Sequence, residues 1–356
     1  MKILITGNMG YIGPSVINQL RASRSDCTLI GFDIGYFGNC FTGDGDLPEC
    51  RLNTQYFGDM RQFPIDILTG VDSIVHLAAI SNDPIGNKFE EVTLDINYRA
   101  SVNLAKKAKD AGVSSFVFAS SCSMYGSADD SARTEKSQLN PLTAYARSKV
   151  LTEEELKPLA SEGFKVTSLR FSTACGWSDR LRLDLVLNDF VAGSVASQQI
   201  TILSDGTPWR PLINVKDMAR AIDWAIGREE SAIGGSFLAV NVGSDEWNYQ
   251  VKDLADAVAS VIPGTAVSIN KDAQPDKRSY KVNFDLFKKL APLHQPNTSL
   301  AESIKELKDG LESIKFRDPE FRNSRYMRLM ILTELQQKGF INEKLQWIRT
   351  LKSSRR

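Results

Sequence analysis

The first half of the chain alternates between short apolar runs rich in β-branched residues and longer stretches whose apolar positions recur at helical spacing. Runs of the first kind predict strands, and stretches of the second kind predict amphipathic helices. The predicted strands cover residues 2–6, 27–33, 54–58, 73–79, 115–120 and 165–171, and the predicted helices cover residues 14–23, 90–111 and 141–162. This alternation predicts an α/β fold, with a doubly wound parallel sheet covered by helices on both faces.

The pattern changes after Phe171 and predicts a smaller, interleaved C-terminal α/β domain. The later predicted elements are helices at residues 183–197, 216–227, 250–261 and 301–313 and strands at residues 199–203 and 237–242. We expect residues 1–173 to form the sheet domain, with residues 215–243 returning to it. Residues 174–214 and 244–316 are then expected to form the smaller domain.

Residues 317–356 form a third, basic segment, which the pattern predicts to be helical over residues 320–338 and to stop at Gly339. After residue 317 the chain carries nine Lys and Arg against four Asp and Glu, a net charge of +5. A basic tail can bind a membrane or nucleic acid. The apolar residues between positions 329 and 335 favour a packing or oligomer surface instead.

Composition narrows the class of protein. The chain has 356 residues, 42% hydrophobic and 24% charged, as in an ordinary globular protein. Lys plus Arg and Asp plus Glu each total 43, and this neutral balance disfavours a protein that coats nucleic acid. The sequence has no apolar run of the ~18–20 residues that span a membrane, and no signal-peptide pattern. Its five cysteines form no C-x-x-C pair and it has two histidines, so we expect no metal site, no disulfide framework and a cytoplasmic location.

A glycine-rich turn joins the first predicted strand to the first predicted helix, with the spacing G-x-x-G-x-x-G over residues 6–13. Gly7 permits the tight turn, Gly10 lets the backbone approach a pyrophosphate, and Gly13 lets helix and strand pack closely. The helix N-terminus then offers free amides and the positive end of its dipole to phosphate. The turn predicts a dinucleotide-binding site.

Asp33 ends the second predicted strand, twenty residues after Gly13. A carboxylate at that place can accept hydrogen bonds from both ribose hydroxyls and repels a 2′-phosphate. The predicted cofactor is therefore NAD rather than NADP.

Tyr145 and Lys149 stand four residues apart at the start of a predicted helix and so share one of its faces. A phenol with a pKa near 10 is a poor base at pH 7, but a nearby ammonium and a positive nicotinamide ring favour the phenolate. Ser120 and Ser121 end a buried strand, where α/β sheets place ligand groups. We expect Tyr145 to exchange a proton with a substrate hydroxyl while Ser121 hydrogen-bonds the reacting oxygen.

With these motifs the chain resembles the extended short-chain dehydrogenase/reductase family, in its nucleotide-sugar epimerase/dehydratase branch. The matching pieces, in order, are residues 6–13, Asp33, residues 58–60, residues 76–79, Asn97, residues 120–126, Tyr145-x-x-x-Lys149, residues 169–171 and Arg210-x-x-Ile213-Asn214-Val215-x-Asp217. They extend over roughly residues 1–316. The resemblance implies a Rossmann-type fold, NAD as cofactor, and a homodimer held by a four-helix bundle.

The resemblance also implies a role for individual residues. Ser121, Tyr145 and Lys149 would form the catalytic triad, and Lys149 would also hold the nicotinamide ribose. The implied cofactor contacts are Gly7, Met9, Gly10, Tyr11, Ile12, Gly13, Asp33, Asp59, Met60, Leu77, Ala78, Ala79, Asn97, Ser120, Tyr145, Lys149 and Phe171. His76 and Cys122 are interpreted as packing residues.

A nucleoside-diphosphate sugar needs cations around its diphosphate, and the smaller domain is expected to supply them. Arg210 and Arg278 match the positions from which family members clamp the diphosphate with guanidinium forks. Residues 178–190 are similar to a branch that includes GDP-heptose 4-dehydrogenases and 4-epimerases. The implied substrate contacts are Ser81, Ser123, Thr173, Arg180, Arg182, Asn188, Arg210 and Arg278.

The sequence departs from the family pattern in ways that bear on the reaction. Cys122 and Ser123 stand where the 4,6-dehydratases carry an Asp-Glu pair, so a 4,6-dehydratase is disfavoured. Thr173 ends a Phe-Ser-Thr run where many 4-epimerases have Tyr-Phe-Asn, and Asn214 replaces a common His. Inversion at C3 or C5 would need a further acid/base pair, for which only Cys122 and Ser123 stand near.

The leading hypothesis is an NAD-dependent epimerase of a nucleoside-diphosphate sugar, acting through a transient 4-keto intermediate. A nucleotide-sugar 4-dehydrogenase or reductase, or another enzyme of the family, is the alternative. A non-catalytic NAD-binding sensor is disfavoured because Ser121, Tyr145 and Lys149 are all present. We expect no nucleic-acid or membrane partner, and the nucleotide base, the sugar and the carbon inverted stay open.

Overall fold

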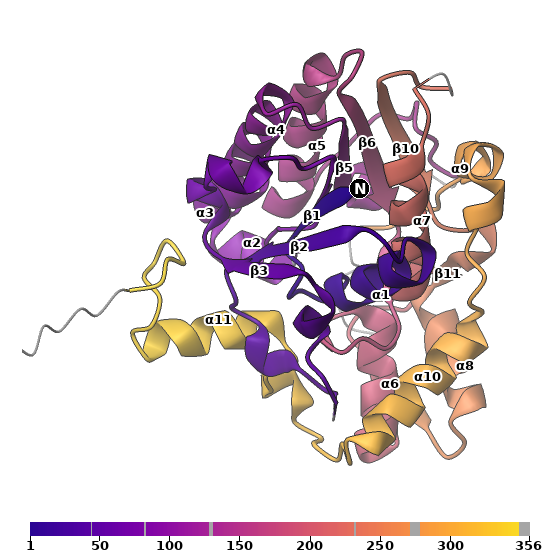
Figure 1. Ribbon diagram of the computed structural model, residues 1–356. Coiled ribbons are helices and arrows are strands. Elements are labelled where there is room, and N and C mark those ends of the chain that lie inside the picture. The colour runs from indigo at the N-terminus through magenta and orange to yellow at the C-terminus, as the bar shows by residue number, and fades with distance from the viewer. Residues whose placement is uncertain (44, 82, 128–130, 231–232, 271–277, 349–356) are drawn as a thin grey trace, which may run out of the picture.

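The computed structural model describes residues 1–43, 45–81, 83–127, 131–230, 233–270 and 278–348, and its central feature is a seven-stranded sheet (Figure 1). The strands are β1 (Lys2–Thr6), β2 (Thr28–Asp33), β3 (Thr54–Phe57), β4 (Ser73–His76), β5 (Ser115–Ser121), β6 (Lys165–Phe171) and β10 (Phe237–Val242). They pair in parallel in the order β10-β6-β5-β4-β1-β2-β3. The predicted Rossmann-type doubly wound sheet is confirmed.

Helices cover both faces of this sheet, and the residues of β1 alternate between them. Ile3 and Ile5 share a core with α1 (Gly13–Ser23) and α7 (Val215–Gly227). Leu4 points the other way, into a core with α4 (Ala100–Asp110) and the end of α5 (Ala144–Leu156). A parallel sheet buried on both faces requires apolar residues at successive positions, as the strands of this chain have.

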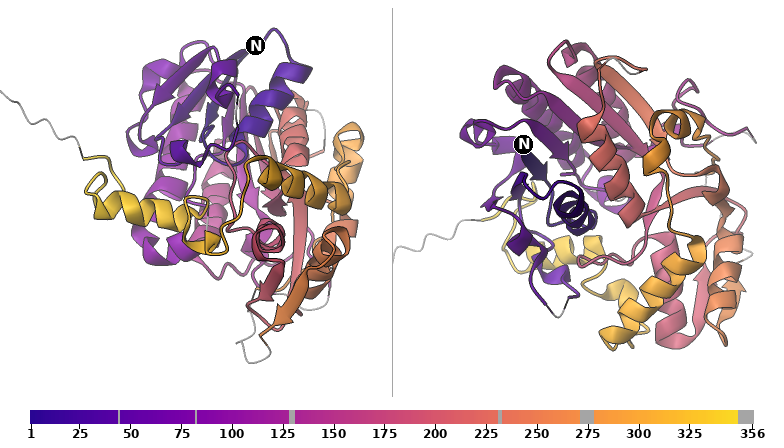
Figure 2. Two further views of the ribbon diagram at one scale, coloured as in Figure 1. Left: turned by 90° about the horizontal axis from the view of Figure 1, so that it is seen from below. Right: turned by 45° about the vertical axis from the view of Figure 1, so that its right-hand side comes forward.

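A second unit lies at the C-terminal end of the main sheet (Figure 2). Its strands are β7 (Thr173–Cys175), β9 (Trp209–Asn214) and β11 (Asn248–Gln250) in one sheet, and β8 (Gln199–Ile202) and β12 (Ala266–Ile269) in another. Helices α6 (Val186–Ser197), α8 (Val251–Val261) and α10 (Leu300–Ser313) contribute to its own apolar core. The chain returns to the main sheet through α7 and β10 before it completes this unit. The domain boundaries at residues 173, 214 and 243 stay a prediction.

The long helix predicted over residues 90–111 is divided in the structure. It consists of α3 (Glu90–Leu94), a π-helical segment (Asp95–Arg99) and α4. The predicted helix over residues 141–162 ends at Leu156, two residues before Pro158. A π-helical turn inside an α-helix is rare and is frequently found at a functional site.

The C-terminal helix is shorter than predicted. Helix α11 (Arg328–Gln337) replaces the helix expected over residues 320–338, although Gly339, at φ +69°, ends it as predicted. Upstream, Ser324 accepts a hydrogen bond on its hydroxyl from the Tyr326 amide at 3.2 Å. Such a bond from a short polar side chain competes with helix formation. Residues 349–356 lie outside the described residues.

The sequence did not predict the three-stranded sheet or the short helices α2 (Asp83–Lys88) and α9 (Asp285–Leu290). Strand β9 contains Pro211, and proline is poorly compatible with an inner strand. Each strand of this sheet has six residues or fewer. Short runs interrupted by proline carry little periodicity from which to predict a strand.

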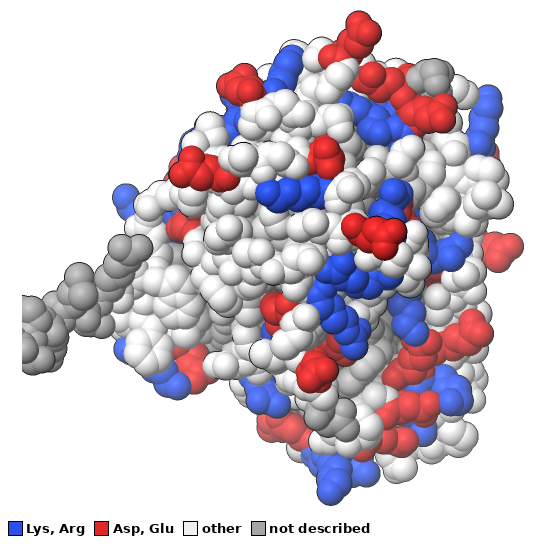
Figure 3. All heavy atoms as spheres, in the orientation of Figure 1, with Lys and Arg blue, Asp and Glu red and all other residues white. Residues whose placement is uncertain are grey.

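The surface shows positive and negative side chains interspersed over the face drawn in Figure 3. No helix within the described part of the chain is long and apolar enough to cross a membrane. All five cysteines are free thiols.

Candidate active site

A pocket of about 820 Å³ opens where strands β1, β2, β4, β5 and β6 end. In a doubly wound sheet the connections diverge beyond the carboxyl ends of neighbouring strands, and ligands bind in that crevice. The predicted cofactor residues in its wall are Gly7, Gly10, Tyr11, Ile12, Asp33, Asp59, Met60, Leu77, Ala78, Ala79, Ser120, Tyr145, Lys149 and Phe171. The predicted catalytic and substrate residues in its wall are Ser121, Ser81, Ser123, Thr173, Arg182, Arg210 and Arg278.

The glycine turn has the geometry that a dinucleotide requires. Gly7 has φ +74°, and a Cβ there would lie 2.5 Å from the Ala78 amide nitrogen. A Cβ on Gly13 would lie 1.8 Å from the Asn8 carbonyl oxygen, so the start of α1 can pack against the turn only as glycine. Ile12 precedes α1 and gives its amides no side-chain cap among the described residues, which leaves them available to phosphate.

Asp33 is held at the end of β2 by two backbone amides. Its carboxylate oxygens accept hydrogen bonds from the Met9 amide at 3.0 Å and the Gly35 amide at 2.7 Å. Burial raises the pKa of this carboxyl group, and the two amide bonds oppose that rise. The carboxylate is thereby fixed at the pocket wall, where it can accept hydrogen bonds from ribose hydroxyls.

Asn97 lies in the π-helical segment, behind the pocket wall. Its side-chain oxygen accepts a hydrogen bond from the Ile80 amide at 2.8 Å, and its side-chain nitrogen donates to the Ile80 carbonyl at 2.8 Å. Its own carbonyl accepts from the hydroxyls of Ser101 and Thr152 at 2.7 and 3.1 Å. Asn97 therefore positions the loop after β4 rather than lining the pocket.

Ser121, Tyr145 and Lys149 come together between β5 and α5. Thr143 caps α5 by accepting a hydrogen bond from the Ala146 amide at 3.1 Å, which sets Tyr145 in the first turn. The Lys149 amine donates to the Ala119 carbonyl at 2.6 Å and lies 5.5 Å from the centroid of the Tyr145 ring. The three predicted catalytic side chains thus share one wall of the pocket.

Burial governs the ionisation of this pair in the protein alone. It raises the pKa of Tyr145 to about 12, and a hydrogen bond with Ser121 lowers it only in part. It also lowers the pKa of Lys149 to about 7, against the opposing effect of Glu153. The expectation that the Lys149 ammonium lowers the Tyr145 pKa is therefore not met by these side chains alone. The positive nicotinamide ring remains as a second source of that effect.

We expect the burial of Lys149 to make stability depend on pH. Below about pH 7 the amine is charged in the folded and the unfolded chain, and the penalty for burying it is present in full. Between about pH 7 and pH 10.5 the unfolded chain binds a proton that the folded chain does not, so the free energy of unfolding rises with pH. Urea unfolding of the wild type relative to Lys149→Met is expected to show this rise, by at most about 3 kcal/mol from pH 7 to pH 9.

The exposed Lys106 on α4 offers a control, and Lys106→Met should unfold with the pH dependence of the wild type. A wild-type stability that runs parallel to that of Lys149→Met over this range would show that the folded chain keeps the Lys149 amine charged.

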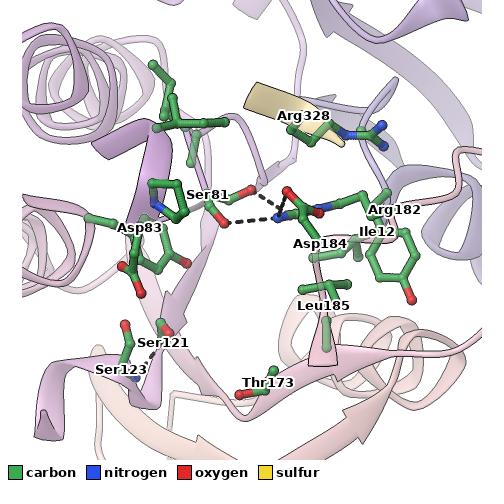
Figure 4. A pocket seen from close by; sticks show the side chains of 18 of the residues that line it. Ile12, Ser81, Asp83, Ser121, Ser123, Thr173, Arg182, Asp184, Leu185 and Arg328 are labelled. Atoms are coloured by element: carbon green, nitrogen blue, oxygen red, sulfur yellow. Dashed lines mark hydrogen bonds and ion pairs between the residues drawn. The ribbon is translucent and has the colours of Figure 1, made fainter. Parts of the chain in front are cut away.

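The arginines predicted to contact the substrate form different ion pairs and hydrogen bonds with the protein. Arg182 pairs with Asp184 at 2.8 Å and donates to the Ser81 hydroxyl at 2.9 Å, as Figure 4 shows. Arg278 pairs with Asp83 at the start of α2. Arg210 donates to the Arg278 carbonyl, so the two arginines that the resemblance assigns to a diphosphate are neighbours.

Besides Asn97, four predicted site residues lie outside the pocket wall. Arg180 is buried, pairs with Glu49 at 2.7 Å and donates to the Gly38 carbonyl at 2.7 Å. Asn188 is buried and donates to the Arg182 carbonyl at 2.8 Å. Met9 and Gly13 also lie outside the lining, although the Met9 amide fixes Asp33. The side chains of Arg180 and Asn188 bond to protein groups, and their predicted contact with the substrate stays a prediction.

His76 and Cys122 have structural surroundings, in agreement with their interpretation as packing residues. His76 is hydrogen-bonded to the hydroxyls of Thr6 and Ser101 at 2.6 and 2.7 Å, and burial lowers its pKa to about 3. Cys122 is fully buried and donates to the Arg170 carbonyl at 3.0 Å, and burial raises the pKa of its thiol. Within the described ranges no group of three His, Cys, Asp or Glu side chains could hold a metal ion.

Sequence reasoning missed several side chains of the pocket wall. Asp83 and Tyr280 belong to the family-like body, and Arg322 and Arg328 to the C-terminal extension. Asp83 stands two residues after the predicted substrate residue Ser81, and from that proximity its place in the pocket wall could have been predicted. The positions of the two extension arginines could not have been predicted, because they lie outside every motif that matches the family.

Known proteins of one family are similar to this chain over most of its length. A model of the NAD dependent epimerase/dehydratase family matches residues 3–243. The uncharacterized UDP-glucose epimerase YtcB of Bacillus subtilis is 29% identical over 255 residues, which are 69% of this chain and 78% of that protein. The putative UDP-glucose 4-epimerase of Methanocaldococcus jannaschii is 24% identical over 320 residues, covering 87% of this chain and 98% of its relative.

Solved structures agree on the fold. The structure of MoeE5 in complex with UDP-glucose and NAD has a TM-score of 0.72 at 24% identity, over 88% of this chain and 99% of its own. The UDP-glucose 4-epimerase of Thermotoga maritima with UDP-glucose has a TM-score of 0.73 at 22% identity, over 88% and 99%. The matched family region contains the glycine turn, Ser121, Tyr145 and Lys149. The chain belongs to the NAD dependent epimerase/dehydratase family, and the resemblance and the NAD cofactor predicted from its sequence are confirmed.

Proposed function

We propose that this protein is an epimerase that inverts a carbon of a nucleoside-diphosphate sugar through a transient 4-keto intermediate. The observation that carries the proposal is the convergence of Ser121, Tyr145 and Lys149 beside the glycine turn, in a pocket whose far wall holds arginines. Relatives named as UDP-glucose 4-epimerases support it. The nucleotide base and the sugar are not part of the proposal.

In this proposal Tyr145 carries the proton of the reacting hydroxyl. NAD, when bound, would accept a hydride from the sugar carbon and then return it to the same carbon. The Tyr145 oxygen takes the hydroxyl proton as the carbonyl forms and returns it when the carbonyl is reduced. The Ser121 hydroxyl donates a hydrogen bond to the reacting oxygen. Lys149 lies on the same helix face as Tyr145, so its amine determines the local charge beside Tyr145 and Ser121.

Inversion requires the keto sugar to present its other face before it is reduced. A diphosphate held at one end allows the sugar to turn about its diphosphate bonds. Arg182, Arg210 and Arg278 lie in the pocket wall where they can hold that diphosphate. Ser81, Ser123 and Thr173, also in the wall, offer hydroxyls to the sugar in either orientation.

A 4,6-dehydratase fits the site less well. Elimination of water needs an acid and a base near the sugar carbons beyond C4. The Cys122 thiol is fully buried and donates to the Arg170 carbonyl at 3.0 Å, so it is turned away from the pocket. Ser123 lies in the wall but has a hydroxyl rather than a carboxyl group. For the same reason Cys122 does not serve the inversion of C3 or C5.

We also propose a homodimer through α4 and α5, in a cytoplasmic protein. Leu94 at the end of α3, Tyr98 in the π-helical segment, and Val150 and Leu151 on α5 are only partly buried, which supports a second copy packing against these segments. Five free thiols support a reducing compartment. Light scattering during gel filtration measures the oligomeric state, and a monomeric mass would contradict the dimer.

The function is tested by incubating the purified full-length protein with UDP-, GDP-, CDP- and dTDP-sugars and identifying the products by NMR. We expect one sugar to be converted to its epimer without added NAD, because the cofactor is regenerated in each cycle. Formation of NADH in step with sugar consumption would instead identify a net dehydrogenase. The absence of turnover with every sugar, in a protein that binds NAD, would contradict both activities.

A further inference from the structure

The C-terminal extension supplies part of the pocket wall, through Arg322, Met327, Arg328 and Leu332. Residues 321–348, which we call the strap, are attached at both ends. The Tyr326 carbonyl accepts a hydrogen bond from the Leu183 amide in the smaller unit, at 3.0 Å. The Trp347 ring nitrogen donates to the Ile34 carbonyl beyond β2, at 2.9 Å. The strap therefore joins the smaller unit to the loop beyond β2.

The strap brings a cation into the pocket wall. Arg328 is the first residue of α11, and only 3% of its surface is exposed although it is charged. It lies in the wall together with Arg182 and Asp184, as Figure 4 shows. A charged side chain is rarely buried to this degree unless an opposite charge or several hydrogen bonds compensate it.

The protein compensates Arg328 only in part. One terminal nitrogen donates to the Arg180 carbonyl at 2.8 Å, and the guanidinium carbon lies 4.6 Å from the centroid of the Phe37 ring. The other terminal nitrogen, Nη1, is buried and has no hydrogen-bond partner in the part of the chain that the structure describes. Arg328 also forms no ion pair with a carboxylate of those residues.

The neighbouring cations already use the nearby carboxylates. Arg180 pairs with Glu49 and Arg182 pairs with Asp184, each through a contact of 2.8 Å or less. Burial, reinforced by the charges of Arg182 and Arg180, lowers the pKa of Arg328 to about 10. Each of the other two guanidinium groups thus has a carboxylate in contact, and Arg328 has none among the described residues. An uncompensated buried charge is unfavourable, and an anion bound in the pocket would remove that penalty.

The position of Arg328 indicates which anion it meets. The phenol of Tyr11, in the glycine turn, lies within electrostatic reach of both Arg182 and Arg328. Ile12 of the same turn and Phe37 beneath Arg328 line the pocket. The amides of this turn bind the diphosphate of a dinucleotide. A guanidinium suits the same group, because it can donate two hydrogen bonds to phosphate oxygens.

We propose that Arg328 binds a diphosphate in the pocket, so that the strap is part of the nucleotide site. The diphosphate is that of NAD or that of the sugar nucleotide, and the nearness of Tyr11 and Phe37 favours NAD. The proposal rests on nucleotide binding and not on the reaction proposed above. Arg328 lies beyond residues 3–243, which the family model matches, so the strap is an addition of this chain to the matched region.

The test measures nucleotide binding to the full-length protein by calorimetry, after bound nucleotide has been removed. The probes are ADP-ribose, which contains the diphosphate of NAD, adenosine, which contains no phosphate, and UDP and GDP. Arg328→Met is expected to weaken ADP-ribose binding by roughly tenfold to a hundredfold and to leave adenosine binding within about twofold. Arg328→Lys keeps a cation and is expected to recover part of the loss.

Arg325→Met is the matched control, because Arg325 is exposed on the same strap and lies outside the pocket wall. It is expected to bind every probe as the wild type does. A loss confined to UDP and GDP would support the proposal with the sugar nucleotide as the source of the diphosphate. Unchanged binding of all diphosphates by Arg328→Met, or an equal loss of adenosine and ADP-ribose, would overturn it. None of these readouts needs turnover, so failure of the proposed epimerase activity would be seen separately.

Discussion

Replacing Tyr145 with Phe is expected to lower kcat by about two to four orders of magnitude. The substitution removes the oxygen that takes up and returns the proton, and it keeps the ring that packs in the first turn of α5. We expect NAD affinity to stay within about threefold of the wild type, because the glycine turn and Asp33 are untouched. Turnover is measured with the sugar identified in the panel, and NAD binding by calorimetry.

Tyr56→Phe is the control for this substitution, because Tyr56 is exposed on β3, away from the pocket wall. It is expected to leave both turnover and NAD binding unchanged. A Tyr145→Phe protein that turns over within a few-fold of the wild type would assign the proton to another group. A wild-type protein that binds NAD and sugar nucleotides but converts none would favour the sensor hypothesis.

Replacing Gly13 with Ala is expected to abolish NAD binding and to lower the free energy of unfolding by about 3 kcal/mol or more. The added Cβ would lie 1.8 Å from the Asn8 carbonyl oxygen and 2.5 Å from its carbon, and both are backbone atoms. The turn and the start of α1 would have to separate. Urea unfolding and calorimetry with NAD measure the two effects.

Two neighbouring glycines make this prediction testable even if Gly13→Ala does not fold. In Gly10→Ala the Cβ would lie 3.1 Å from the Gly7 carbonyl, so we expect a folded protein with weakened NAD binding. In Gly38→Ala the nearest atom, at 3.8 Å, is the end of the Met9 side chain, and no effect is expected. Equal stability of all three variants would contradict the close packing of α1 against the turn.

The parts of the site that could be predicted are those encoded by neighbouring residues. Within one strand or one helix, the spacing of residues along the sequence determines where their side chains lie. This holds for the glycine turn, for Asp33 at the end of a strand and for the Tyr145–Lys149 pair. The order of the main sheet follows from strand–helix alternation, because right-handed crossovers allow few arrangements. These features could therefore be predicted from the sequence.

The parts that could not be predicted depend on contacts between distant segments. Arg180 and Arg182 are two residues apart in a stretch without periodicity, so the local pattern does not distinguish which of them lies at the pocket wall. Glu49 pairs with Arg180, while Ser81 and Asp184 hold Arg182 at the pocket wall. Glu49 and Ser81 lie far from these arginines along the chain, and only Asp184 is near. No local pattern therefore shows which partner holds each arginine.

The π-helical segment is a second case. The spacing of residues 90–111 predicts a continuous helix, and the structure inserts one wider turn at Asp95–Arg99. That turn gives Asn97 two bonds to Ile80 and two bonds at its own carbonyl, which together offset the poorer backbone geometry. Three of these four bonds come from the loop after β4 and from α5, so most of the compensation is absent from the local sequence.

The strap also orders the events of synthesis. The strap at residues 321–348 follows the whole main sheet along the chain, so it leaves the ribosome after the sheet. Because domains fold progressively from the N-terminus during synthesis, the sheet can be complete while the pocket still lacks the residues that the strap adds to its wall. A dinucleotide can therefore meet a nascent chain before Arg328 has joined the pocket wall. The part of the pocket wall that the strap provides then forms after the rest of the site.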